Sequence, residues 1–185
     1  MPIPLGILAA AGFRPPAAAG SYDLLETVTL SSNAASVEFT NLVTKYSATY
    51  KHLQIRMITR LSNTSTATDQ LMRFNGVTTS SYASHRMLGN GSSVVSQNQT
   101  SATSMLIGFV DGDQFTASVI DILDPFVTTK NKTARCLFGA HGFAREVMLT
   151  SGFLNSTNAI SSVTLFPIVA NYLAGTRISL YGIKG

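Results

Sequence analysis

The chain has 185 residues, enough for one domain with a sizeable buried core. Charged residues make up only 12% of it, against about 25% in typical soluble domains, and Ser and Thr together supply roughly a quarter. The net charge of +4 comes from scattered single Lys and Arg residues, which disfavours nucleic-acid binding, and no apolar stretch is long enough for a transmembrane helix, so no membrane insertion is expected.

An apolar segment opens the chain, because residues 1–13 contain no charged side chain. Pro2 and Pro4 break any helix there, and they stand where a signal peptide needs Lys or Arg, so a signal peptide is disfavoured. Such an arm has no polar face for water, so we expect it to dock on another part of an assembly. Its expected anchoring side chains are Ile3, Leu5, Ile7, Leu8 and Phe13.

The next segment, residues 14–20, has two prolines and three alanines, which predicts an extended linker. We therefore predict an anchoring arm and linker over residues 1–20 and a single β-sandwich domain over residues 21–185. In this domain, short β-like runs alternate with turn residues, and residues 41–50 hold one helical turn. The expected strands cover residues 25–30, 36–40, 51–60, 69–75, 82–88, 103–110, 114–123, 133–140, 145–151, 160–166 and 176–183.

The run from Lys51 to Arg60 is the clearest strand, because its apolar and polar residues alternate. The pair Asp111-Gly112, between two apolar runs, predicts a hairpin turn. So many short strands without a long helix predict an all-β protein, an antiparallel two-sheet sandwich with a jelly-roll-like arrangement and an extended N-terminal arm.

Motifs for catalysis and metal binding are not found. The histidines His52, His85 and His141 lack the paired spacing of metal ligands, and no Gly-x-Ser-x-Gly motif occurs. We therefore expect no enzyme activity, no cofactor and no metal. Asp111 and Asp113 could together bind calcium, but a tight turn is the preferred interpretation.

Two further side chains have expected structural roles. Asp121 lies among apolar residues and, if buried, needs a partner such as Arg56, Arg73 or Arg135. The single cysteine, Cys136, cannot form an internal disulfide and is expected to be a small buried hydrophobe.

Carbohydrate binding stays open as an alternative, since jelly rolls often host it. Tyr82, Tyr172 and Tyr181 are the candidate glycan contacts, although each also fits a packing role on a sheet. The absence of Trp weakens this alternative.

Six short segments, spread in order along nearly the whole chain, together carry a resemblance to a known family. They are PIPLGILAAA (2–11), YKHLQIR (50–56), RFNG (73–76), GNGSS (89–93), VIDILD (119–124) and SLYGIKG (179–185). Together they resemble a family of small virion proteins of tailed bacteriophages, notably marine and cyanobacterial ones. The resemblance implies a β-rich, oligomeric and non-enzymatic structural protein on the virion surface, with other virion proteins as partners.

We accordingly expect a tail-fibre or tail-appendage subunit that is located in the virion, anchored by its N-terminal arm and assembled as a homo-oligomer, with a trimer favoured. A capsid decoration (cement) protein on the head is the first alternative. A carbohydrate-binding module that recognises a host surface glycan is the second. A small hydrolase is the third, and it predicts a Ser or Asp beside one of the histidines in a concave pocket.

Overall fold

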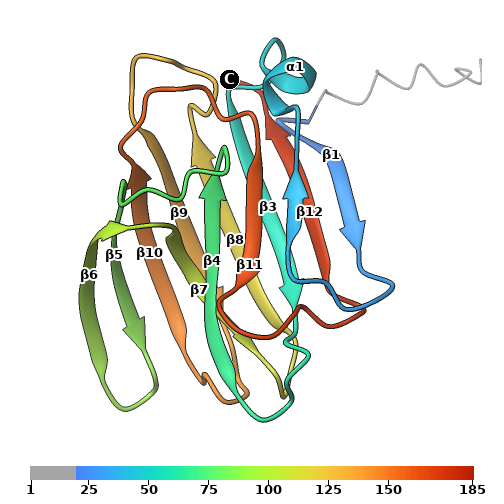
Figure 1. Ribbon diagram of the computed structural model, residues 1–185, viewed down its shortest axis with the longest axis vertical. Helices are drawn as coiled ribbons and strands as arrows, with labels where there is room; N and C mark the ends of the chain where they lie inside the picture. Colours follow the sequence, from blue (N-terminus) through green and yellow to red (C-terminus); the bar gives the residue numbers. More distant parts are fainter. Residues whose placement is uncertain (1–19) are drawn as a thin grey trace, which may run out of the picture.

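The computed structural model describes residues 20–185, so the anchoring side chains expected in the arm, Ile3 to Phe13, lie outside the described residues. The described part contains twelve strands and one short helix (Figure 1). These elements are β1 (Tyr22–Thr29), β2 (Val37–Phe39), α1 (Leu42–Tyr46), β3 (His52–Thr59), β4 (Ala67–Phe74), β5 (Tyr82–Gly89), β6 (Val94–Ala102), β7 (Met105–Asp111), β8 (Thr116–Leu123), β9 (Lys132–Gly139), β10 (Val147–Leu154), β11 (Val163–Pro167) and β12 (Arg177–Ile183).

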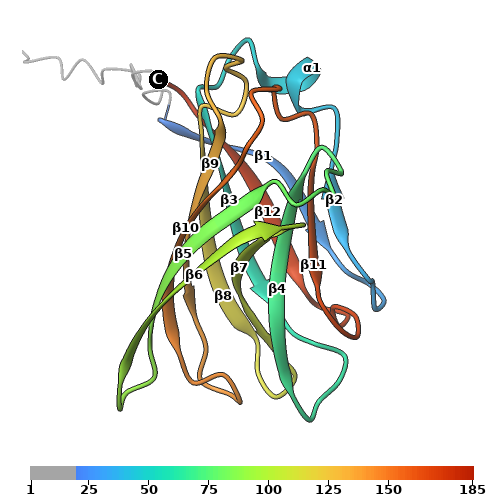
Figure 2. The same cartoon turned by 60° about the vertical axis from the view of Figure 1, so that its left-hand side comes forward.

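The strands form two antiparallel sheets that pack face to face, which confirms the predicted β-sandwich (Figure 2). The larger sheet has eight strands in the order β1-β12-β3-β8-β9-β10-β5-β6. The smaller sheet has four strands in the order β2-β11-β4-β7. The core lies between the two sheets, where side chains from their inner faces meet.

The connectivity is that of a jelly roll with two inserted strand pairs. Without β5, β6, β9 and β10, the sheets read β1-β12-β3-β8 and β2-β11-β4-β7, and each consecutive strand lies in the opposite sheet except β7, which pairs with β4 in the smaller sheet. This nested alternation is the double Greek key of a jelly roll. The pairs β9–β10 and β5–β6 both extend the larger sheet beyond β8, so that sheet becomes twice as wide as the smaller one.

Period-two alternation explains why the inner faces form a core. In β9, Ala134, Cys136 and Phe138 are buried, whereas Arg135 and Leu137 between them are exposed. Cys136 is therefore a buried side chain as expected. Its Sγ donates to the carbonyl oxygen of Ile107 at 2.7 Å, and burial raises the pKa of its thiol to about 12.

The expected hairpin at Asp111-Gly112 is wrong, because β7 and β8 lie in different sheets. The turn is a crossover between layers. The Asp111 carboxylate is fully buried and accepts backbone N–H bonds from Asp113 at 2.9 Å and Ala144 at 3.0 Å. Both oxygens already have backbone donors, so the geometry favours the turn interpretation over a calcium site.

Strand β6 is the one strand that no sequence pattern predicted. It contains few apolar residues, and nearly all its side chains are exposed. Because β6 is an edge strand with neither face fully covered, it lacks the alternation that reveals a half-buried strand.

Candidate functional surfaces

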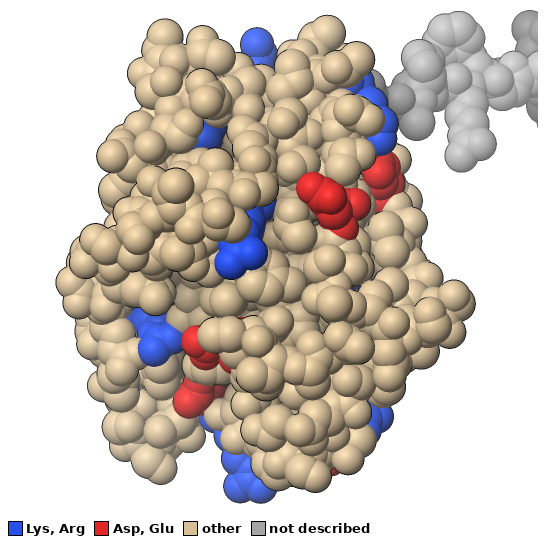
Figure 3. Space-filling view, viewed as in Figure 1, with Lys and Arg blue, Asp and Glu red and all other residues tan. Residues whose placement is uncertain are grey.

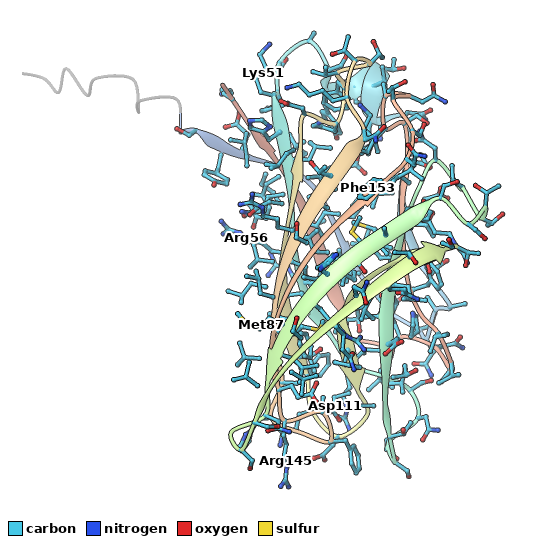
Figure 4. All side chains as sticks on the ribbon, turned by 90° about the vertical axis from the view of Figure 1, so that its left-hand side faces the viewer. Lys51, Arg56, Met87, Asp111, Arg145 and Phe153 are labelled. Carbon is cyan, nitrogen blue, oxygen red and sulfur yellow. The ribbon has the colours of Figure 1, made fainter. Side chains whose placement is uncertain are left out.

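The outer face of the eight-stranded sheet is broad and mostly uncharged. In Figure 4, Arg56 and Met87 project from this side, away from the smaller sheet. Alternation places one residue of every two on this face, so its composition follows directly from the strand registers.

Six exposed apolar side chains gather on the middle strands of this face. Four of them continue one another across the sheet: Val119 pairs with Leu137, Leu137 with Leu149, and Leu149 with Met87. Beside this row, Ile58 on β3 and Val147 on β10 complete the group. The set is called here the apolar patch: Ile58, Met87, Val119, Leu137, Val147 and Leu149. Its members are between 37% and 60% exposed, which is unusual for so many adjacent apolar residues.

A polar row borders the apolar patch. Along it, Gln54 pairs with Asp121, Asp121 with Arg135, and Arg135 with Ser151. Gln54 Nε2 donates to Asp121 Oδ1 at 2.7 Å, and Arg56 Nε donates to Gln54 Oε1 at 2.8 Å. Asp121 therefore lies on the outer face and is linked to Arg56 through Gln54.

Arg73, one of the three arginines expected as partners of Asp121, lies on β4 in the other sheet. Its Nε donates to the carbonyl oxygen of Thr103, and its guanidinium lies over the Phe166 ring. It cannot serve as that partner.

Two of the three candidate glycan contacts are wrong because their rings are buried. Tyr82 is 1% exposed and its hydroxyl bonds to the backbone of Phe74, while Tyr172 is fully buried and accepts from Gln70 Nε2 at 3.1 Å. Tyr181 lies on the outer face, partly covered by the Arg56 guanidinium at 4.7 Å from its ring centre. The sequence could not separate these tyrosines, because Tyr82 and Tyr181 lie in expected strands and Tyr172 lies between two of them, and none of these positions reveals whether the ring is buried.

The histidines do not form a catalytic arrangement within residues 20–185. His52 Nδ1 accepts the backbone N–H of Asp124 at 3.0 Å and lies 3.5 Å from its carboxylate. His85 and Ser151 are cross-strand neighbours that line a shallow hollow on the outer face, but no hydrogen bond joins them and no acidic residue lines that hollow. His141 is exposed in the loop between β9 and β10. The nucleophile, base and acid of a hydrolase are not brought together.

A polar cleft lies where the β5–β6 pair extends past the edge of the smaller sheet. It has a volume of about 460 Å³. Figure 3 shows few charges on the side of the smaller sheet, and a small group of both signs lies at its lower left, toward β5 and β6. The residues that line the cleft are Asp69, Ser84, Arg86, Ser96, Gln97, Asn98, Gln99 and Leu106, of which all but the last are polar.

Arg86 organises the charges of the polar cleft. Its guanidinium donates to Gln97 Oε1 and is thereby oriented by β6. Burial raises the pKa of Asp69, and the charge of Arg86 partly opposes this effect. Glu146 behaves in the same way, because burial raises its pKa and the charge of Arg86 opposes the rise. The Oε2 atom of Glu146 is buried without a hydrogen-bond partner. The cleft thus pairs one oriented cation with a partly desolvated carboxylate, and sequence patterns gave no signal for it.

No family model matches the chain, and a comparison with curated proteins found no match. Among residues 20–185, no helix is long and apolar enough to cross a membrane. In the same described range, no three His, Cys, Asp or Glu side chains lie close enough together to hold a metal ion.

Proposed function

We propose that the protein is a non-enzymatic structural subunit of a bacteriophage virion, a tail appendage that is anchored through residues 1–20. The observation that carries the proposal is the apolar patch on a wide, weakly charged sheet face. On monomeric soluble proteins a contiguous group of exposed apolar residues is often functional, and large ones mark protein or membrane interaction sites and ligand grooves. The jelly-roll fold agrees with this role, since it is common in viral capsid domains, although it is also found in lectins.

The composition supports an assembly role on physical grounds. Desolvation of neutral Ser, Thr and Asn side chains costs less free energy than desolvation of charged ones. A surface rich in them is therefore easily covered by a neighbouring protein. The apolar arm adds buried area that a compact domain lacks. Its five large apolar side chains would contribute roughly 7–15 kcal/mol before ordering entropy is subtracted.

The anchoring proposal is tested by removing residues 1–20. Strand β1 begins at Tyr22, so the truncated protein is expected to keep both sheets, with an unchanged circular dichroism spectrum and melting temperature. It is expected to be missing from purified particles. A full-length variant with Ala17→Ser and Ala18→Ser in the linker is the matched control and should be incorporated. Normal incorporation of the truncated protein would contradict anchoring by the arm.

A second candidate function, glycan binding, is favoured by the polar cleft. Amide, carboxylate and guanidinium groups on facing strands can donate to and accept from neighbouring sugar hydroxyls. We expect a glycan-array signal that weakens tenfold or more with Arg86→Gln, about 1.4 kcal/mol of binding free energy. Arg73→Gln is the control, because Arg73 is likewise an arginine on a strand but lies on β4 of the smaller sheet, outside the cleft. An array without signal at high protein concentration would remove this candidate.

A further inference from the structure

We propose that the outer face of the eight-stranded sheet binds the same face of a second copy, with a two-fold axis parallel to the strands between β8 and β9. The inference rests on the proposed assembly role and names the partner of that surface. The gap between β8 and β9 is the middle of the sheet, with four strands on either side. An axis at this position therefore overlaps the two sheets over their full width.

The size of the face fits a stable protein interface. Eight strands have seven spacings of about 4.8 Å, which gives a width of roughly 34 Å. Most of these strands have eight residues and so extend about 26 Å along the chain direction. The product is roughly 900 Å², close to the ~800 Å² that each partner contributes to a standard interface.

The two-fold axis places apolar residues on apolar residues. It exchanges β8 with β9 and β3 with β10, and the cross-strand registers then fix which side chains meet. Val119 of one copy faces Leu137 of the second, and Ile58 faces Val147. Four of the six members of the apolar patch of each copy, Ile58, Val119, Leu137 and Val147, are thereby covered by the apolar patch of the other copy.

The same two-fold rotation places opposite charges of the two copies against each other. Asp121 and Arg135 are cross-strand neighbours on either side of the axis, so each Asp121 faces an Arg135 of the second copy. The four groups alternate in sign around the axis. Arg56 faces Leu149, and Arg177 faces Gly89, so no two like charges meet. An isologous interface requires this self-complementarity.

Sedimentation velocity of the full chain at tens of micromolar tests the association. The expected result is a dimer that Leu137→Glu converts to a monomer. Leu137 is 55% exposed, so this change leaves the core intact, and an unchanged circular dichroism spectrum confirms that the fold is kept. Ile168→Glu is the matched control, because Ile168 is similarly exposed but follows β11 in the smaller sheet. A monomeric wild type, or the trimer favoured from the sequence, would overturn the proposal.

Thiol cross-linking tests the position of the axis. Arg56→Cys and Leu149→Cys lie on β3 and β10, three strand spacings or roughly 14 Å apart within one copy, but they face each other in the dimer. A bifunctional thiol reagent that spans less than roughly 14 Å should therefore link the two cysteines only between two copies. Native Cys136 is buried and does not compete. The pair Arg56→Cys and Val94→Cys should give no cross-linked dimer, and equal cross-linking of both pairs would contradict the axis. A result that contradicts this axis would not change whether the protein is incorporated into particles. The dimer proposal and the proposed virion role can therefore be contradicted independently.

Discussion

At the scale of single residues, the Asp111 carboxylate joins the crossover after β7 to the loop between β9 and β10. The two carboxylate oxygens accept N–H bonds from Asp113 and Ala144. The backbone carbonyl oxygen of Asp111 accepts the N–H of Leu61. A buried acceptor of this kind is difficult to replace, because its donors would be left without partners.

Asp111→Asn tests this role. The amide retains one oxygen and turns an NH₂ group toward a backbone N–H, so we expect a loss of about 1–3 kcal/mol in the free energy of unfolding. Urea denaturation measures it. Asp113→Asn in the same turn is the control, since Asp113 is exposed and should change stability by no more than about 0.5 kcal/mol. Equal effects at the two positions would contradict the assigned role of Asp111.

Gly112, the next residue, is required because the backbone of another loop lies against it. A Cβ at Gly112 would lie 1.8 Å from the carbonyl oxygen of Asn63, so Gly112→Ala must displace a loop and should lower stability by about 3 kcal/mol. A Cβ at Gly89 meets nothing within 4 Å, and Gly89→Ala is expected to stay within about 0.5 kcal/mol of wild type. Similar urea midpoints for both variants would show that the approach at Gly112 does not limit stability.

Asp69 gives a pH-dependent prediction. Burial raises its pKa above the ordinary value of 3.8, so its ionised form destabilises the fold at neutral pH. This destabilisation disappears below pH 3.8, where the side chain is protonated in both the folded and the unfolded chain. Asp69→Asn should therefore raise the melting temperature at pH 7 and leave it unchanged at pH 3. A variant that is less stable than wild type at pH 7 would contradict this explanation.

At the scale of elements, period-two alternation predicted most strands, because the inner face of each strand is buried and the outer face is not. The run from His52 to Thr59 shows it: Leu53, Ile55 and Met57 enter the core as the pattern indicated. Alternation could not predict β6, which has no buried face. It also could not show that the strands flanking Asp111 belong to different sheets, because a turn sequence does not reveal which strand pairs with which.

Hydrogen exchange tests the element-level account. Strand β8 is paired on both sides, with β3 and β9, whereas β6 pairs only with β5. Amides of β8 should exchange slower than those of β6 by orders of magnitude, because their exchange requires opening of the central sheet. Comparable protection in the two strands would show that the β5–β6 pair is covered by contacts beyond those within one copy.

At the scale of the whole molecule, the strand insertions explain how a jelly roll gains surfaces for partners. The pairs β9–β10 and β5–β6 double the width of one sheet. The outer side of the widened sheet carries the apolar patch, and its overhang beyond the smaller sheet creates the polar cleft. The sequence predicted the fold class but neither surface. Both depend on strand order, and two of the three tyrosines chosen as glycan contacts proved to be core residues.

Immunogold electron microscopy and mass spectrometry of purified particles test the virion role most directly. We expect the protein to be a stoichiometric particle component, with label at the tail. Label spread evenly over the head would instead support the decoration role. Particles that lack the protein altogether, from cells that express it, would contradict the structural role.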